Sequence, residues 1–380
     1  MLHTASSGRP VIALYTSSHG FGHAVRCAAL CRALLTACPD LQIVARTAAP
    51  AWIFPPGVEV DHCIVDAGVV QPSSLEIDPV ATLERYAALV ATEPARLDQE
   101  VARMREIGAR TIVADVPSAA FEIAARVGVP GIGLANFSWD WIYEPYVEGR
   151  PAYAPLLTHL REQYARASML LRLPFHGDLG AFPVVEDVPL IARRSTTDRA
   201  ETRRRLGLPP DAPLVLFSFG GHLSALPDAD RLAALGGYAF VATAAGNAAE
   251  VDGLAVRHGQ NLFVLPTLTD AYVDLLAACD AAIVKPGYGI VADLIANRVP
   301  ALYVSRAGYR EEPVLAQALE SDARAVALDR AALDALDLGP ALAWLFALDR
   351  PWTTRPLDGA EAIARRILAL AGCHRRERGF

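Results

Sequence analysis

The stretch Val11-Ile12-Ala13-Leu14-Tyr15-Thr16-Ser17-Ser18-His19-Gly20-Phe21-Gly22-His23 decides the fold of this chain. Its first six residues form an apolar, β-rich run of the length of a buried parallel strand. Residues 24–37 are dense in apolar side chains and contain neither Gly nor Pro, which predicts a helix. The loop between them would stand at the carboxyl end of the first strand of an open α/β sheet, where ligands bind.

That loop, residues 17–23, holds two glycines and two histidines. Gly20 and Gly22 permit close backbone approaches, and the start of the helix offers free N–H groups to an anion or an oxyanion. The dinucleotide-binding fingerprint is absent, because its third glycine would stand at Val25. Two histidines in one glycine-rich loop point to proton transfer instead.

The composition limits the class of protein. A length of 380 residues, with 53% hydrophobic residues, suits two domains of ordinary size. The net charge of −7 disfavours non-specific binding to nucleic acid or to acidic membranes. No apolar run reaches the roughly 20 residues of a membrane helix, and the N-terminus lacks the pattern of a signal peptide. The six cysteines form no Cys-x-x-Cys pair, so we expect a reduced, cytoplasmic protein without structural zinc.

Strand candidates alternate with helical segments along the whole chain. Strand, helix and strand at this spacing indicate right-handed parallel crossovers. The expected fold class is therefore α/β, with two Rossmann-like doubly wound domains that face each other across a cleft. Residues 66–78 are expected to form a loop, because they contain Pro72 and a Ser-Ser pair. The expected strands lie at residues 41–46, 58–65, 111–114, 131–135 and 168–173, and then at 214–219, 238–242, 262–265, 281–285 and 301–305.

A polar, proline-containing stretch near residues 190–210 separates the two halves. We expect an N-terminal domain at residues 1–190, a linker at 191–209 and a C-terminal domain at 210–350. Residues 351–380 are expected to hold a closing helix that can return to the first domain.

His23 and Asp115 are candidate catalytic residues. His23 follows the first strand and Asp115 ends a later one, and the carboxyl ends of parallel strands meet at one edge of a sheet. A carboxylate behind an imidazole fixes its tautomer and leaves the other ring nitrogen to take a proton. The alternative is that both residues merely cap helices. His19 is a second candidate, either for the base or for a hydrogen-bonding orienter.

In the second half, Lys285-Pro286-Gly287-Tyr288-Gly289 ends a strand and opens a helix. A lysine beside free helix N–H groups favours a phosphate. Asp293, one turn into the helix, is placed to accept hydrogen bonds from ribose hydroxyls, and Gly220 and Gly221 would let backbone amides approach a diphosphate. A surface lysine and a capping aspartate are the alternatives.

Two further segments have two interpretations each. The aromatic segment Phe137-Ser138-Trp139-Asp140 is either a packed corner or a wall that binds an acceptor, since aromatic rings with a few polar tips suit sugar faces. Glu311 and Glu312, beside Arg310, hold sugar hydroxyls or simply begin a charged helix.

Together these motifs resemble those of the two-domain GT-B glycosyltransferases. The resemblance is stronger to the glycosyltransferase-like N-terminal half of plant-type L-arabinokinases and their stand-alone bacterial relatives. It is more distant to UDP-glycosyltransferases and to the peptidoglycan N-acetylglucosaminyltransferase. The matching segments, spread over residues 10–320, are His19-Gly20-Phe21-Gly22-His23-Ala24, Asp66-Ala67-Gly68-Val69-Val70-Gln71, Asn136-Phe137-Ser138-Trp139-Asp140, Phe219-Gly220-Gly221, Lys285-Pro286-Gly287-Tyr288-Gly289 and Glu311-Glu312-Pro313.

The resemblance implies an inverting, metal-independent hexosyl- or pentosyltransferase. It would move a sugar from a nucleotide-diphosphate sugar of the UDP or dTDP type to an acceptor hydroxyl, with His23 as the base, Asp115 as its partner and no separate cofactor. The first domain would hold a small-molecule or glycan acceptor and the second the nucleotide-sugar donor; the oligomeric state stays open. The donor-binding residues would be Gly220, Gly221, Lys285, Gly287, Tyr288, Gly289, Asp293, Glu311 and Glu312, and the acceptor-binding residues Gly20, Phe21, Gly22, Phe137, Trp139 and Asp140.

Lys285 and Tyr288-Gly289-Ile290 depart from the donor motif of the UDP-glycosyltransferases, which has a His and a Trp-Asn-Ser there. Two alternative functions therefore stay open. One is a nucleotide-sugar epimerase or hydrolase on the same fold. The other is a non-catalytic module that binds a nucleotide sugar.

Overall fold

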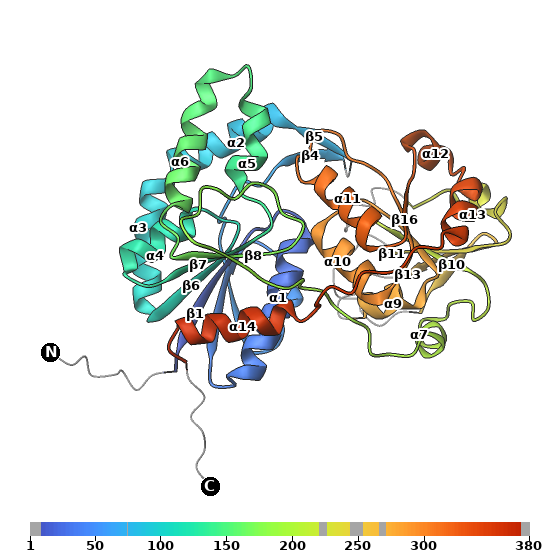
Figure 1. The fold of residues 1–380 in the computed structure, drawn as a ribbon, viewed down its shortest axis with the longest axis horizontal. Coiled ribbons are helices and arrows are strands. Elements are labelled where there is room, and N and C mark those ends of the chain that lie inside the picture. The colour runs from blue at the N-terminus through green and yellow to red at the C-terminus, as the bar shows by residue number, and fades with distance from the viewer. Residues whose placement is uncertain (1–8, 74, 220–225, 244–253, 266–270, 374–380) are drawn as a thin grey trace, which may run out of the picture.

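The computed structural model describes residues 9–73, 75–219, 226–243, 254–265 and 271–373. Two seven-stranded sheets, each covered by helices, form two lobes that lie side by side (Figure 1). The expected α/β class with two doubly wound sheets is confirmed.

The first sheet consists of parallel strands, and its order reverses between β1 and β6. This is the strand order of a doubly wound fold, in which the point of reversal opens a crevice at the carboxyl edge of the sheet. In spatial order the strands are β3 (Val58–His62), β2 (Gln42–Thr47), β1 (Val11–Thr16), β6 (Ala109–Asp115), β7 (Gly131–Ala135), β8 (Met169–Arg172) and β9 (Val185–Asp187).

The second sheet repeats this plan, with its reversal between β10 and β14. Only the edge pair of β12 and β13 is antiparallel among the paired strands of this sheet that the structure describes. In spatial order the strands are β12 (Val256–His258), β13 (Leu262–Leu265), β11 (Ala239–Thr243), β10 (Leu214–Ser218), β14 (Ala281–Val284), β15 (Ala301–Tyr303) and β16 (Ala325–Ala327).

Helices cover both sheets (Figure 1). None of the described helices is both long and apolar enough to cross a membrane. Those of the first lobe are α1 (Phe21–Ala37), α2 (Pro79–Ala91), α3 (Glu93–Glu106), α4 (Ala119–Val127), α5 (Trp139–Val147), α6 (Ala154–Tyr164) and α14 (Gly359–Leu370). Those of the second lobe are α7 (Arg199–Leu206), α8 (Ala229–Ala233), α9 (Tyr272–Ala278), α10 (Tyr288–Asn297), α11 (Glu312–Asp322), α12 (Arg330–Ala335) and α13 (Gly339–Ala347).

Strand β1 shows why an uninterrupted apolar run is needed at the centre of the first sheet. Side chains alternate across a strand, so Ile12 and Leu14 join the core beneath α1 and α14. Ala13 and Tyr15 join the opposite core, beneath α3, α4 and α6. Both faces of the strand are therefore buried, as a doubly wound sheet requires.

Helix α14 brings the C-terminal part of the described chain back into contact with the first lobe. It packs on α1, and its residues Ile363 and Ile367 are fully buried in the same core as Leu14. An isolated β-bridge joins Asp358, just before α14, to Ile191. The chain thus leaves the first lobe after β9, builds the second lobe and then returns to the first.

One sequence-based expectation needs correction. Residues 66–78, expected to be a loop, contain the antiparallel hairpin of β4 (Val70–Ser73) and β5 (Glu76–Asp78). Its strands are too short for periodicity to reveal them. The segment from Trp139, for which a packed corner and an acceptor-binding wall are the two interpretations, forms the first turn of α5. Pro94 lies in the first turn of α3, a position that proline tolerates.

The start of α14 generates a stability prediction. A Cβ atom on Gly359 would lie 2.4 Å from the carbonyl oxygen of Pro189 and 2.7 Å from that of Leu190. Gly359→Ala must push α14 away from this backbone, so we expect the free energy of unfolding to fall by about 1–3 kcal/mol. Chemical denaturation measures this. Gly237→Ala is the control, because no atom lies within 4 Å of its added Cβ; equal stabilities of the two variants would contradict the prediction.

Candidate functional site

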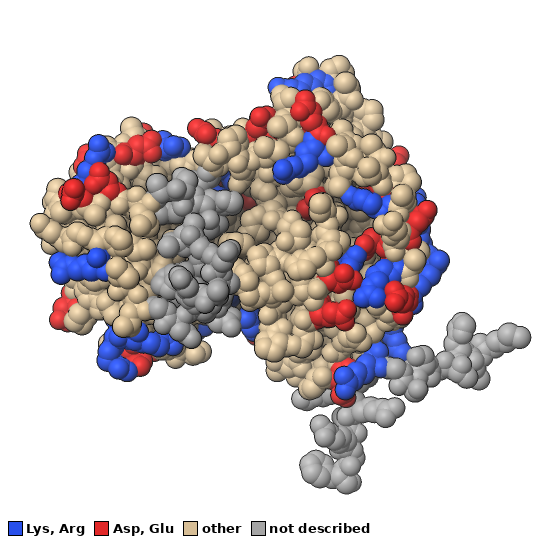
Figure 2. Space-filling model, turned by 180° about the vertical axis from the view of Figure 1, so that it is seen from behind, with Lys and Arg blue, Asp and Glu red and all other residues tan. Residues whose placement is uncertain are grey.

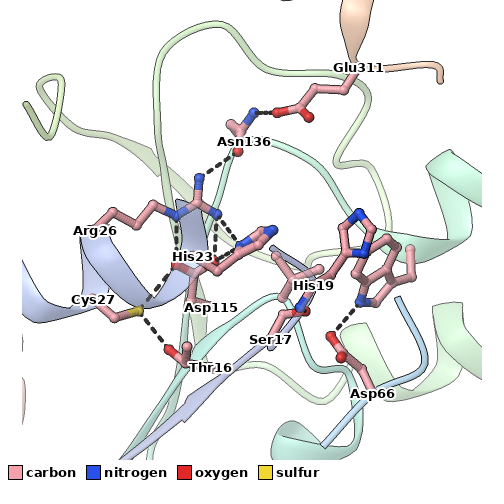
Figure 3. A network of polar contacts seen from close by, with 12 residues as sticks. Thr16, Ser17, His19, His23, Arg26, Cys27, Asp66, Asp115, Asn136 and Glu311 are labelled. Carbon is pink, nitrogen blue, oxygen red and sulfur yellow. Dashed lines mark hydrogen bonds and ion pairs between the residues drawn. The ribbon is translucent and has the colours of Figure 1, made fainter. Parts of the chain in front are cut away.

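The carboxylate of Asp115 is the centre of a buried polar cluster (Figure 3). It ends β6, in register with Thr16 at the end of β1, and its side chain is fully buried. Its oxygens accept hydrogen bonds from Arg26 Nε at 2.6 Å and Nη2 at 2.5 Å and from Cys27 Sγ at 3.2 Å, and His23 Nδ1 lies 2.9 Å from Oδ1. The cluster therefore lies at the point where the strand order of the first sheet reverses.

Asp115 stays ionised despite its burial. Burial alone would raise the pKa of this carboxyl group, but the Arg26 guanidinium and His23 together hold the pKa well below its usual range. The guanidinium is stabilised in return, because Asp115 raises the pKa of Arg26 against the effect of burial. The two charges form a bidentate pair, the strongest geometry for such a contact.

His23 lies in the first turn of α1 with 7% of its surface exposed. Its ring meets the ring of Phe137 edge to face at 5.5 Å. When Nδ1–H donates to Asp115, Nε2 carries the lone pair and can accept a proton. Arg26 Nη2 lies 3.0 Å from the same Nδ1 atom, and if it donates there instead, the proton resides on Nε2 and His23 is no base.

His19, the second candidate base, has a different arrangement. Its Nδ1 accepts a hydrogen bond of 3.4 Å from the backbone N–H of Val69. A neutral His19 therefore carries its proton on Nε2 and acts as a donor rather than as a base. Its ring contacts the rings of Trp139 at 5.8 Å and Tyr309 at 6.4 Å.

Arg26 is a residue of this site that the sequence interpretation missed. Its Nη1 donates to Asn136 Oδ1 at 2.8 Å, and Asn136 Nδ2 donates to Glu311 Oε1 at 2.6 Å. The guanidinium also lies 5.0 Å from the centre of the Tyr288 ring. A chain of buried polar contacts thus runs from the carboxylate of Asp115 in the first lobe, through Arg26 and Asn136, to Glu311 at the start of α11 in the second (Figure 3).

The two glycine-rich helix starts abut each other. A Cβ atom on Gly289 would lie 3.9 Å from the Cα atom of Gly22, and Gly287 is the N-cap residue directly before α10. Gly20, which precedes α1, adopts a φ of 68°, a conformation that favours glycine. The N-termini of α1 and α10, both proposed to face ligands, are therefore neighbours. Gly220 and Gly221 lie outside the described residues.

The three acidic residues expected to bind the donor sugar nucleotide each accept a hydrogen bond from another part of the protein. Asp293 accepts hydrogen bonds from Arg193, with Nη2 at 2.5 Å and the backbone N–H at 2.9 Å. Glu311 accepts from Asn136, as described. The carboxylate of Glu312 accepts from the backbone N–H of Arg306, and burial raises its pKa. Lys285 lies partly buried at the end of β14, where burial and the neighbouring Arg306 lower its pKa to about 8.

The aromatic acceptor candidates divide into buried and exposed residues. Trp139 is fully buried, stacks on Tyr143 at 5.4 Å and donates from Nε1 to Asp66 at 2.9 Å. Phe137 is also buried, between His23 and Tyr309. Phe21 is 37% exposed, beside Trp52. The remaining candidate, Asp140, pairs with Arg161 at 3.1 Å.

Val116, directly after Asp115, has a φ of 84°. A β-branched residue in this conformation is strained by about 1–3 kcal/mol. Its carbonyl oxygen accepts a hydrogen bond of 2.9 Å from Tyr164. The spacing of residues in the sequence does not indicate this strain. It lies directly after Asp115, whose carboxylate contacts His23 and Arg26.

In the described part of the chain, no group of three or more His, Cys, Asp or Glu residues is arranged to hold a metal ion. The charged groups at the site include the Arg26–Asp115 pair and Lys285, which interacts electrostatically with Arg306.

The fold is that of the GT-B glycosyltransferases. A glycotransferase of kitacinnamycin aligns with a TM-score of 0.59 and 17% identity over 95% of this chain and 99% of its own. A UDP-glucosyltransferase from Polygonum tinctorium aligns with a TM-score of 0.56 and 14% identity over 98% and 96%.

In sequence, the chain is 33% identical to L-arabinokinase from Arabidopsis thaliana over 325 residues, which are 83% of this chain. The aligned part is only 30% of that protein's length. No protein-family model matches the chain.

The Asp115 cluster generates a prediction with a defined pH dependence. Asp115→Asn leaves the buried guanidinium of Arg26 without its counter-charge, so we expect the free energy of unfolding at neutral pH to fall by about 3–5 kcal/mol. Because folding lowers the pKa of Asp115, its contribution is complete above the unfolded-state pKa of about 4 and is lost as the pH falls further.

Urea denaturation of both proteins at several pH values measures the difference. It should be constant between about pH 5 and pH 8 and shrink below about pH 4. Asp98→Asn is the control, because the pair of Asp98 with Arg126 is exposed and its loss should cost less than about 1 kcal/mol. A difference that widens in acid would contradict the prediction.

Proposed function

We propose that this chain, which has the fold of the GT-B glycosyltransferases, is an inverting, metal-independent glycosyltransferase. It moves a hexose or pentose from a nucleotide-diphosphate sugar, of the UDP or dTDP type, to the hydroxyl of a small molecule or glycan. The observation that carries the proposal is the 2.9 Å contact of His23 Nδ1 with Asp115 at the strand-order reversal of the first sheet. Ligands bind at such reversals in open α/β sheets.

In the proposed mechanism His23 is the general base. Nδ1–H donates to Asp115, and Nε2 takes the proton of the acceptor hydroxyl as its oxygen attacks the anomeric carbon of the donor. The bond from that carbon to the diphosphate oxygen breaks on the opposite face, so the configuration inverts. Asp115 stabilises the imidazolium ion that forms, and Arg26 keeps Asp115 ionised for this purpose.

The leaving nucleoside diphosphate departs toward the second lobe. The free N–H groups at the start of α10 and the ammonium group of Lys285 are available to its negative charge, with no metal in the scheme. The contact of Gly22 with Gly289 supports this assignment, because it puts the two helix starts on either side of one small region.

The contact between Asn136 and Glu311 bears on how the donor sugar binds in this proposal. Oε1 of Glu311 accepts a hydrogen bond of 2.6 Å from Asn136, so a sugar hydroxyl that binds to this oxygen must share it with Asn136 or displace the amide. Domain motions that open and close over the substrate are common among enzymes that must exclude water.

One observation favours a second function, a module that binds a nucleotide sugar without turnover. Arg26 Nη2 lies 3.0 Å from His23 Nδ1. If Nη2 donates a hydrogen bond to Nδ1, the neutral imidazole carries its proton on Nε2, and His23 then cannot act as the base. A hydrolase or epimerase on the same fold is distinguished by donor turnover in the absence of acceptor. Assays with and without acceptor therefore separate the three functions.

Replacement of His23 tests the base. We expect His23→Ala to lower kcat for sugar transfer, or for slow donor hydrolysis, by about 100- to 10,000-fold, while the Kd for UDP or dTDP stays unchanged. His258→Ala is the control, because His258 is an exposed residue of the edge strand β12. Binding with no turnover in wild type would instead support the module, and equal turnover in His23→Ala would exclude His23 as base.

The lowered pKa of Lys285 generates a prediction for the pH dependence of nucleotide binding. Burial and Arg306 lower its pKa to about 8, so the charged form is lost as the pH rises through 8. We expect the affinity for UDP to fall about tenfold between pH 7 and pH 9. Lys285→Arg, which stays charged in this range, should remove most of the fall. Calorimetric titrations measure both, and an identical pH dependence in the variant would contradict the assignment.

A further inference from the structure

Arg306 is a buried cation that the mechanism above does not use. It lies between β15 and α11, with only 6% of its surface exposed. Its guanidinium carbon lies 3.8 Å from the centre of the Tyr309 ring. That ring is 6.4 Å from the rings of both His19 and Phe137. The guanidinium is therefore next to the aromatic residues that surround the histidine loop.

Among the residues that the structure describes, the guanidinium forms no ion pair, although the carboxyl group of Glu312 is close enough to interact with it electrostatically. Its Nε atom is enclosed and has no hydrogen-bond partner there. The nearby Glu312 binds the backbone N–H of Arg306 instead, and burial raises the pKa of that carboxyl group. On the face drawn in Figure 2, by contrast, basic and acidic side chains mostly lie in mixed groups.

Lys285 is the second cation at this place. It directly follows β14, whose last residue, Val284, pairs with Tyr303 at the end of β15. Arg306 comes three residues after Tyr303, so both cations extend from the same edge of the sheet. Arg306 is close enough to disfavour the charge of Lys285. Within the described part of the chain, Glu312 is the acid that interacts electrostatically with Arg306, and neither cation forms an ion pair there.

Two neighbouring cations that form no ion pair are costly to bury. Such an arrangement is stable when an anion completes it, and an arginine is suited to bind two oxygens of one phosphate or carboxylate at once. Stacking on Tyr309 fixes the plane of the guanidinium. The free Nε–H and the fixed plane together point to a ligand with paired anionic oxygens.

We propose that Arg306, together with Lys285, binds an anionic oxygen group of the donor substrate. This inference rests on the proposed function. Two parts of a donor carry such a group: the diphosphate that leaves, or a carboxylate on the transferred sugar. In either case Arg306 is a binding residue for which the donor motif at 285–289 gives no sign.

Titration calorimetry with UDP, UDP-glucose, UDP-glucuronate and inorganic pyrophosphate tests this inference in wild type and Arg306→Gln. We expect the variant to bind at least one of these ligands about 10- to 100-fold more weakly. Equal weakening for UDP, UDP-glucose and UDP-glucuronate assigns the diphosphate. Weakening for UDP-glucuronate alone assigns the sugar carboxylate. Arg330→Gln is the matched control, because Arg330 is an exposed residue paired with Asp334.

Thermal unfolding without ligand separates binding from folding. Because Arg306→Gln removes a buried charge that forms no ion pair with a described residue, the melting temperature of the variant should equal or exceed that of wild type. A marked decrease would overturn the proposal, since the arginine would then be structural. Unchanged affinity for every ligand that wild type binds also overturns it. If wild type binds pyrophosphate through Arg306 but no nucleotide, the anion site stands and the proposed transferase function fails. If it binds none of the four, both fail.

Discussion

The ion pair between Arg26 and Asp115 is the contact on which the rest of this structure depends. A fully buried carboxylate can exist only with its charge matched and its oxygens hydrogen-bonded, and Arg26 does both through two nitrogens. The same pair ties α1 to the end of β6, aims Asp115 at His23 and continues through Asn136 to the second lobe. The chemistry of the site and the docking of the lobes therefore share one set of atoms.

Because these atoms are shared, the tautomer of His23 depends on the position of the second lobe. Arg26 contacts His23 on one side and the Tyr288 ring on the other. Movement of α10 would change the position of the guanidinium and with it the hydrogen bond that selects the imidazole tautomer. Two lobes that merely approach each other would have no such coupling. Here a charged side chain is common to both.

Much of the fold could be predicted from patterning, because buried parallel strands such as Val11–Thr16 are recognisable without context. The meeting of His23 with Asp115 followed from strand topology alone. Arg26 could not be found in this way: in a helix rich in apolar residues one arginine normally lies on the surface, and its partner is 89 residues away. The burial of Trp139 could not be predicted either, because it depends on the contacts of this side chain with Asp66 and Tyr143 in the folded chain. The hairpin at 70–78 could not be predicted, because its strands contain too few residues to show a periodic pattern.

The return of α14 to α1 has a consequence for how the molecule is made. The first lobe consists of two pieces of sequence separated by the entire second lobe, so it is a discontinuous folding unit. While the chain emerges from the ribosome, the apolar surface of α1 that Ile363 and Ile367 finally cover stays open until the last helix has been synthesised. Domains usually fold in order of synthesis. In this protein the lobe that begins first is completed last, and during that interval its exposed face is the part of the nascent chain that most needs shielding.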